Sequence, residues 1–231
     1  MNKKDSIKSI FLLLYIYNTF LLTNLDTNVP TITINSGTYD FWNNNLLYNV
    51  EFGLSSGIVT CKNNTRSNAT VTTYSSIQTL GVNSITCTAT SNSNIIASST
   101  NNIIINSTVP LSNIYGLGNA NKNEEYLIIG NGGVQYGPYY QANKGCYYVT
   151  YNGENLNTYI NGYQASENET NYGNHLYNLK YLNYISTDAN YFVHLDENTK
   201  YNGLETVLYN NGDELIKIKK ITISYFGENC P

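Results

Sequence analysis

Apolar and polar residues alternate over many short stretches of the chain, which is the pattern of β-strands with one buried face. The clearest stretch is residues 146–151, in which Tyr147, Val149 and Tyr151 share one face. Residues 152–153 are Asn-Gly, and this pair between alternating stretches is typical of a two-residue hairpin turn. We therefore expect a half-buried strand here that ends at a hairpin.

Other such stretches fall into two groups, one on each side of a polar stretch at 112–126 that we interpret as a connector. In the first group the expected strands are 31–34, 46–52, 58–62, 69–74, 83–89 and 102–105. In the second group they are 126–129, 146–151, 159–164, 191–195, 204–210 and 215–226. Short strands at this spacing predict an all-β protein with two β-sandwich domains, at residues 26–110 and 111–231.

The last expected strand changes its apolar phase halfway. Ile216 and Ile218 stand at even positions, whereas Ile221, Ile223 and Tyr225 stand at odd positions, with Lys219-Lys220 at the change. A β-bulge, or a corner between two sheets, would absorb one residue and return the apolar side chains to the same face.

Residues 1–25 precede the expected domains and differ from them in character. Lys3, Lys4 and Lys8 come before an apolar run at 10–22. As a helix this run would be about 20 Å long, short of the roughly 30 Å hydrocarbon core of a bilayer, so a signal peptide fits better than a membrane span. Because no Ala-x-Ala motif precedes Asp26, an uncleaved signal anchor stays open, with membrane contact only through residues 10–22.

The composition favours export. Of the 231 residues, 41% are apolar, which is enough to bury a core, and only 12% are charged. Asn, Ser, Thr and 23 Tyr supply most of the polarity, as is typical of exported β-proteins, although AT-rich coding would produce a similar bias. The net charge is -4 and Lys and Arg form no cluster, so we expect no nucleic-acid partner.

The four cysteines suggest two disulfides. Cys61 with Cys87 and Cys146 with Cys230 are the pairs that we favour, because each pair lies within one expected domain. Four cysteines allow three connectivities, and four free thiols are the alternative. No Cys-x-x-Cys or Cys/His spacing suggests zinc, and we expect no metal site. Disulfides and the signal-like start together place the protein outside the cell or on its surface.

The first group of strands resembles a bacterial immunoglobulin-like module over about residues 27–108. The most specific part is LGVNSITCTAT at residues 80–90, with Gly81 at the turn and Cys87 on the strand. In such modules the cysteine of this strand forms a disulfide with the cysteine of an earlier strand. Trp42, the only tryptophan, lies upstream of the first cysteine, unlike the tryptophan of antibody domains. The resemblance implies a stalk or spacer.

The second group resembles jelly-roll modules of the carbohydrate-binding type over about residues 124–230. The stretches that carry the likeness are YGPYYQANKGCYYVTYNGENL, ANYFVHL, LETVLYNN and LIKIKKITISYF. This resemblance implies a fold and a glycan-binding role, without naming the sugar.

The chain shows no pattern of catalytic residues. His175 and His194 are isolated, and His194 alternates with Phe192 in a way that favours a sheet-face position. No Gly-x-Ser-x-Gly nucleophile motif is present. Most carboxylates of the second group stand in expected turns, but Glu205 stands inside a strand. The oxygen-rich runs at 196–198 and 213–214 could supply calcium ligands, although neither forms a recognised calcium loop. We expect neither catalysis nor a cofactor.

Tyrosines in turns are the remaining candidates for ligand binding. A tyrosine ring packs on the C–H face of a pyranose while neighbouring amides bond its hydroxyls. The alternative is that these rings fasten loops to the sheet faces. The candidates are Tyr136, Tyr139, Tyr140, Tyr163 and Tyr172.

These observations together predict an exported, non-catalytic surface protein in which an immunoglobulin-like spacer presents a jelly-roll module that binds a glycan or a surface protein. One rival is a structural surface or filament subunit anchored by residues 10–22. Another is a hydrolase that uses Glu205 with a second carboxylate.

Overall fold

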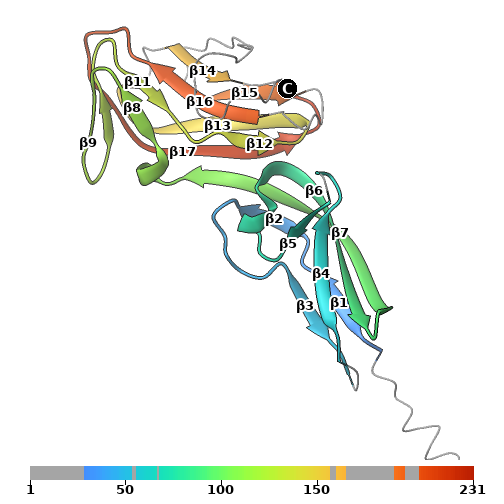
Figure 1. Cartoon of the computed structure of the whole chain (residues 1–231). Helices are drawn as coiled ribbons and strands as arrows, with labels where there is room; N and C mark the ends of the chain where they lie inside the picture. Colours follow the sequence, from blue (N-terminus) through green and yellow to red (C-terminus); the bar gives the residue numbers. More distant parts are fainter. Residues whose placement is uncertain (1–28, 54–55, 67, 157–159, 165–189, 196–202) are drawn as a thin grey trace, which may run out of the picture.

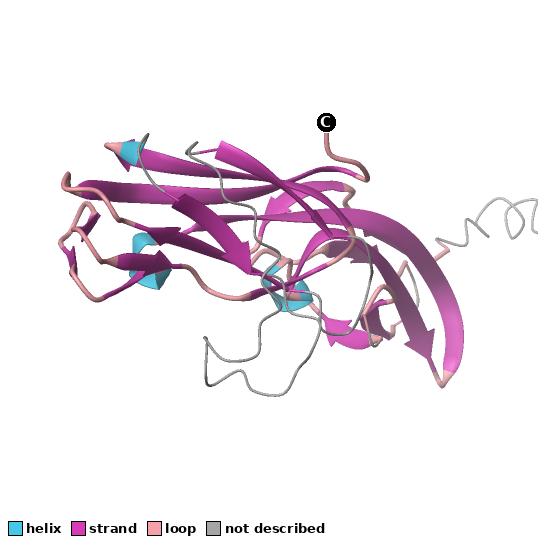
Figure 2. Cartoon of the chain, turned by 90° about the horizontal axis from the view of Figure 1, so that it is seen from above, coloured by secondary structure: helices cyan, strands magenta, loops and turns pink. Residues whose placement is uncertain are grey.

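The computed structural model describes residues 29–53, 56–66, 68–156, 160–164, 190–195 and 203–231, which Figure 1 draws in colour. These residues are almost all strand, as predicted, with a few short 3₁₀ turns and no α-helix among them (Figure 2). The expected signal segment lies outside the described residues. Within the described ranges, no helix is long and apolar enough to cross a membrane.

The N-terminal part of the molecule is the lower part of Figure 1. Its elements are β1 (Thr31–Ile34), β2 (Gly37–Asp40), β3 (Tyr48–Glu51), β4 (Ile58–Asn63), β5 (Ala69–Val71), η1 (Ser75–Ile77), β6 (Thr79–Ser91) and β7 (Asn94–Val109). β6 and β7 form a long antiparallel hairpin, β4 pairs with β6, and β2 pairs with β7 in parallel. β1 and β3 form a separate two-stranded sheet.

The C-terminal part is the upper part of Figure 1. Its elements are η2 (Leu111–Asn113), β8 (Tyr115–Leu117), β9 (Ala120–Lys122), β10 (Leu127–Ile129), β11 (Val134–Tyr136), β12 (Tyr140–Ala142), β13 (Gly145–Glu154), β14 (Ile160–Gln164), β15 (Asn190–Leu195), β16 (Gly203–Tyr209) and β17 (Ile216–Gly227). One layer is β9-β10-β17-β13-β15 and the other is β8-β11-β16-β14, with β12 also on β16.

The core of the C-terminal part lies between these two layers. Tyr147, Val149 and Ile218 are buried from one layer and Leu208 from the other. The Tyr151 hydroxyl crosses the core and donates to Gln135 Oε1 at 2.9 Å. A buried polar group needs such a partner, so this bond allows Gln135 to point inward from β11.

The expected bulge in the last strand is confirmed. Asn152 of β13 lies opposite Lys220, and the next residue, Gly153, lies opposite Ile218, so Lys219 is the extra residue. The prediction of a hairpin turn at 152–153 is wrong, because β13 continues through both residues to Glu154. A Cβ on Gly153 would lie 1.8 Å from the Lys217 carbonyl oxygen, so the glycine serves close backbone approach instead of a turn.

Both disulfides have the pairing favoured from the sequence. Cys61 and Cys87 are directly opposite on β4 and β6, so this bond joins neighbouring strands of one sheet. Antibody domains differ, because their disulfide connects two sheets. Cys146–Cys230 ties the C-terminal end of the chain to the start of β13.

Strands of the two expected domains share hydrogen bonds. The end of β7 pairs with β17, with Val109 opposite Ile221, and β12 pairs in parallel with β6. The polar stretch at 112–126 is no simple connector, because it forms β8 and β9. The expected boundary near residue 110 coincides with the end of β7, and the division into two independent domains stays a prediction.

Candidate functional site: an aromatic cleft

A bulge between β11 and β12 places the candidate tyrosines. Both strands pair with β16, but Tyr136 lies opposite Val207 and Tyr140 lies opposite Leu204, so the segment between them carries one extra residue. Gly137 keeps the ladder intact by donating its N–H to the Thr206 carbonyl at 2.9 Å. The following residue is proline, which cannot donate to a ladder and is suited to a bulge.

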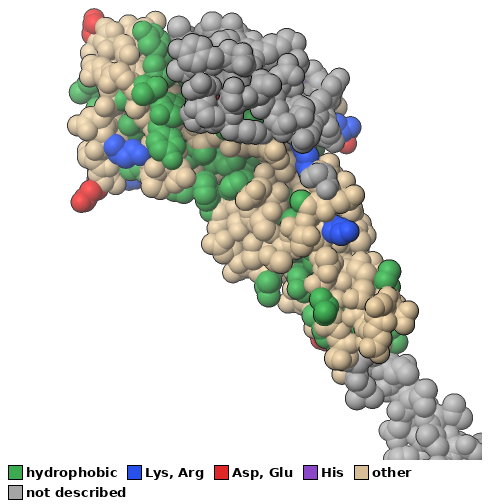
Figure 3. Space-filling view, viewed as in Figure 1, with side chains coloured by type: hydrophobic (Ala, Val, Ile, Leu, Met, Phe, Trp, Pro, Cys, Tyr) green, Lys and Arg blue, Asp and Glu red, His purple; other side chains and the backbone are tan. Residues whose placement is uncertain are grey.

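The bulge borders a cleft of about 570 Å³, a size common for small-molecule sites. Its walls come from distant parts of the sequence, including the end of β2 and the end of η1. The lining residues are Phe41, Gln78, Tyr115, Tyr136, Gly137, Pro138, Tyr139, Tyr140 and Gln141. In Figure 3, green side chains gather where the upper part of the molecule meets the lower part.

The aromatic walls are held in place by contacts with one another. Tyr115 and Tyr136 are directly opposite on β8 and β11, and their rings stack with centroids 5.4 Å apart. The Lys122 ammonium lies 5.5 Å from the centroid of the Tyr115 ring. On the other side, Phe41 packs edge-on against Tyr140, with centroids 4.9 Å apart. Rings fixed in this way lose little freedom when a ligand packs on them.

Tyr140 is a structural part of the wall. It is only 2% exposed, and its Oη accepts a hydrogen bond from Ser107 Oγ at 2.8 Å. Burial raises the pKa of the Tyr140 hydroxyl well above its usual range, so the group stays neutral. Tyr140 therefore shapes the cleft, whereas the partly exposed Tyr136 and Tyr139 offer ring surface to a ligand.

Two glutamines give the cleft its polar groups. Gln78 ends η1 in a left-handed conformation, with φ 54°. Gln141 lies opposite Thr79, the residue that follows Gln78, in the parallel pairing of β12 with β6. Among the described residues, neither glutamine side chain has a hydrogen-bond partner. Each amide offers both donors and an acceptor, which matches the hydroxyl groups of a sugar.

None of the described lining residues carries a charge, and two charged side chains beside them already have partners. The Asp40 carboxylate accepts from the backbone N–H groups of Trp42, at 2.9 Å, and Thr108, at 2.8 Å. Lys122 Nζ donates to the Ser112 carbonyl at 3.4 Å. The cleft therefore suits an uncharged ligand.

The structure brings together three of the five tyrosines expected from the sequence. Tyr136, Tyr139 and Tyr140 line one cleft. The backbone of Tyr163 lies in β14 opposite Thr206, while its side chain and all of Tyr172 are outside the described residues. Sequence reasoning missed Phe41, Gln78 and Tyr115, and their one signal was aromatic or amide character next to a turn.

Glu205 is the one buried carboxylate with an unpaired atom in the described part of the chain. It is 2% exposed, and its Oε1 has no hydrogen-bond partner. Burial, the only cause that contributes, raises the pKa of Glu205 to about 7. The alternation along β16 places Glu205 on the face opposite to Leu204 and Leu208, and it does not line the cleft. A second carboxylate close to Glu205 would raise its pKa further by charge repulsion, and no described carboxylate contributes to the shift in this way.

The other candidate chemistry is dispersed. His194 lies on an exposed face of β15, as expected, with Nε2 3.1 Å from the Glu228 carbonyl oxygen; His175 and the run at 196–198 fall outside the described residues. No group of three or more possible metal ligands occurs within those ranges. A second hollow of about 410 Å³ near His194 is lined mostly by polar residues, such as Asn143 and Lys144.

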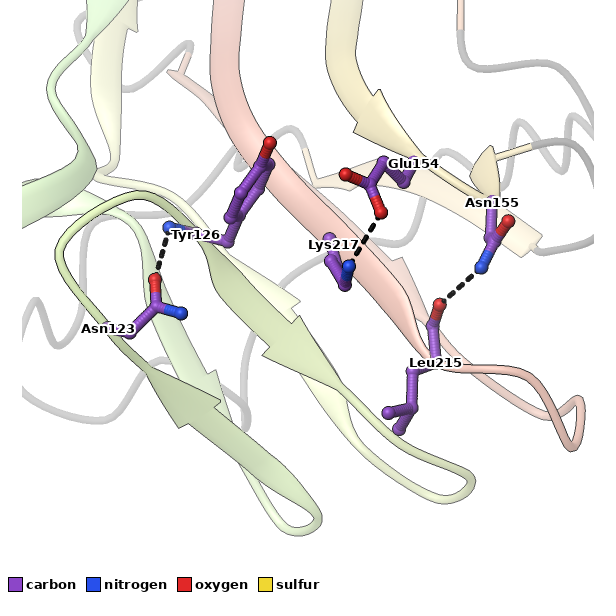
Figure 4. Close-up of polar contacts among 6 residues, drawn as sticks. All are labelled: Asn123, Tyr126, Glu154, Asn155, Leu215 and Lys217. Carbon is purple, nitrogen blue, oxygen red and sulfur yellow. Dashed lines mark hydrogen bonds and ion pairs between the residues drawn. The ribbon is translucent and has the colours of Figure 1, made fainter.

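An exposed ionic cluster lies on the opposite layer of the sandwich (Figure 4). Lys217 Nζ forms an ion pair with Glu154 at 2.6 Å and lies 5.7 Å from the centroid of the Tyr126 ring. The pairing lowers the pKa of Glu154 and raises that of Lys217. Exposed ion pairs contribute little to stability. Tyr126 is a partly exposed tyrosine that lies outside the cleft.

Comparison with known proteins gives only a coarse likeness. No family model and no curated protein matches the sequence. A structure of the second CBM51 module, in complex with GlcNAc, and the INT domains of Clostridium perfringens ZmpB is 10% identical with a TM-score of 0.26, and the match covers 85% of this chain and 48% of that chain. A structure of carbohydrate-binding modules from the β-sandwich superfamily is 10% identical with a TM-score of 0.28, covering 86% of this chain and 97% of that one.

A third similar structure is an enzyme. Bacteroides uniformis β-glucuronidase 2 is 8% identical with a TM-score of 0.26, and the match covers 87% of this chain and 30% of that chain. This chain thus spans about half the length of the first structure and less than a third of the enzyme. Likeness at these TM-scores gives no information about the ligand, and the functional conclusion depends on the cleft itself.

Proposed function

We propose that this chain is an exported glycan-binding protein whose aromatic cleft takes an uncharged sugar. The observation that carries the proposal is the combination of fixed aromatic walls, two glutamine amides without partners among the described residues, and the absence of charge from the described lining. Rings bind the C–H face of a pyranose, and the amides bond its hydroxyls. The two disulfides support an oxidising, extracellular location.

The proposal gives the N-terminal part a larger role than that of a spacer. Phe41 and Gln78 belong to the N-terminal part, and they line the same cleft as Tyr136 and Gln141. In this account the N-terminal part supplies one wall of the binding site.

The test is a glycan array probed with the full chain, followed by calorimetry with the best uncharged ligand. We expect Tyr136→Ala and Gln141→Ala each to weaken binding by about tenfold, because each removes a contact worth about 1 kcal/mol or slightly more. Tyr126→Ala removes a tyrosine outside the cleft and serves as the matched control. The proposal fails if no sugar binds, or if the control weakens binding as much as the cleft variants do.

The structural-subunit rival requires an uncleaved N-terminal segment. Intact-mass measurement of protein from its native source separates the two accounts. A mature chain that begins near residue 26 supports export as a free binding protein, and a chain that keeps residues 10–22 supports an anchored subunit.

A further inference from the structure

The cleft opens onto an apolar strip on the outer face of β8, β11 and β16. Alternation places outward-facing residues in two cross-strand rows. One row is Tyr115, Tyr136 and Val207, and the other is Leu117, Val134 and Tyr209. Figure 3 shows a band of green side chains over the region where β8 and β11 lie in Figure 1.

Half of the residues in this strip are exposed to solvent, and the others are partly exposed. Tyr115 is 42% exposed, Leu117 49% and Tyr209 40%. None of the six residues in the two rows is charged. Glu205 also stands on the outer face of β16, but it is buried and adds no exposed charge to the strip.

The strip and the cleft are continuous, because Tyr115 and Tyr136 belong to both. We infer that the ligand is an oligosaccharide whose chain leaves the cleft over this stacked pair and continues along the strip. This inference depends on the proposed function and specifies it further: the natural ligand is a chain of several uncharged sugar units.

The size of the strip favours a sugar chain over a protein partner. Three strands at about 4.8 Å spacing make it about 10 Å across, and residues two apart on one strand are about 7 Å apart. A stable protein interface buries roughly 800 Å² on each partner, far more than this area provides. Linked pyranose rings, one or two beyond the cleft, fit these dimensions.

The test is calorimetry of the full chain with a series of uncharged oligosaccharides of one type, from disaccharide to hexasaccharide. Affinity should rise roughly tenfold with the units that reach the strip, as expected for one or two added aromatic contacts. The double variant Leu117→Ser, Tyr209→Ser should abolish this gain and leave disaccharide affinity unchanged. Phe226→Ser, which removes an apolar side chain 57% exposed on another layer, is the control and should keep the gain.

Equal affinity for all lengths, or a gain that survives in the double variant, would overturn the inference while leaving the cleft as a sugar site. Absence of binding to any length would overturn the proposed function, and the inference with it. Sedimentation of the free protein adds a further outcome: a wild-type dimer that the double variant converts to monomer would assign the strip to contact between copies of the chain.

Discussion

Ser107 on β7 donates a hydrogen bond to the Tyr140 hydroxyl on β12 at 2.8 Å, and both residues are buried. This bond joins a strand of the N-terminal part to a strand of the C-terminal part beside the cleft. It holds the Tyr140 ring against Phe41, at the place where the cleft wall changes from one part of the chain to the other.

Tyr140→Phe should therefore lower the free energy of unfolding by about 1 to 3 kcal/mol, because it leaves the Ser107 hydroxyl buried without its partner. Urea unfolding measures the change. Tyr209→Phe removes a hydroxyl from a tyrosine that is 40% exposed and should be close to neutral. Equal stability of the two variants would show that the Ser107 bond contributes nothing.

Arg66 should couple the two parts in unfolding. It is 9% exposed and donates from Nε to Asn143 Oδ1 at 3.1 Å and from Nη2 to the Ala142 carbonyl at 2.6 Å. Arg66→Met should cost about 2 to 3 kcal/mol, since it leaves buried acceptors unpaired. Lys62→Met, at an exposed position on β4, is the control.

The same experiment tests cooperativity. Trp42, the only tryptophan, reports on the N-terminal part, whereas far-UV circular dichroism reports on all strands. We expect coincident urea transitions by both probes, with both shifted equally in Arg66→Met. Separate transitions would show that the two parts unfold independently.

Much of the fold follows from local patterns, and the cleft does not. Alternation indicates most of the longer strands, and the change of phase at Lys219 reveals the bulge, because both are properties of neighbouring residues. The Asn-Gly pair at 152–153 was misleading because pairing along β17 and close packing on Lys217 override the local turn preference. Strands of three residues, such as β8 and β11, are too short to show alternation.

The residues of the cleft differ in how far the sequence can predict their positions. Tyr136, Tyr139 and Tyr140 stand together in the sequence, so their common position could be predicted. Phe41 and Gln78 reach the cleft only through the pairing of β2 with β7 and of β6 with β12. No local pattern contains those pairings.

Glu205 should make stability depend on pH. Its pKa is raised from 4.5 to about 7 by burial, so the folded chain binds more protons than the unfolded chain between these values. Stability should therefore fall as pH rises from about 4.5 to about 7, by up to about 3 kcal/mol, and then level off. Glu205→Gln should remove this slope.

Unfolding free energies from pH 4 to pH 8 measure the effect. Glu125→Gln, at an exposed position before β10, is the control and should keep the wild-type slope. A wild-type curve that matches that of Glu205→Gln over this range would show that Glu205 ionises as readily in the folded chain as in the unfolded chain.

The disulfides should stabilise the chain unequally. Their sequence separations are 26 for Cys61–Cys87 and 84 for Cys146–Cys230. Loop-closure entropy gives about 3.5 and 4.6 kcal/mol respectively, so paired Cys→Ser replacement of the second disulfide should cost more. Urea unfolding of the two double variants compares them, with non-reducing peptide mapping to verify the remaining bond. The reverse order would contradict the loop-entropy account.

The most direct measurement is a crystal structure of the full chain bound to the uncharged oligosaccharide that the array selects. We predict a pyranose ring packed on Tyr136 or Tyr139 in the aromatic cleft, with Gln78 and Gln141 bonded to its hydroxyls. A sugar seated elsewhere, for example in the polar hollow beside His194, with the aromatic cleft empty, would contradict the central claim.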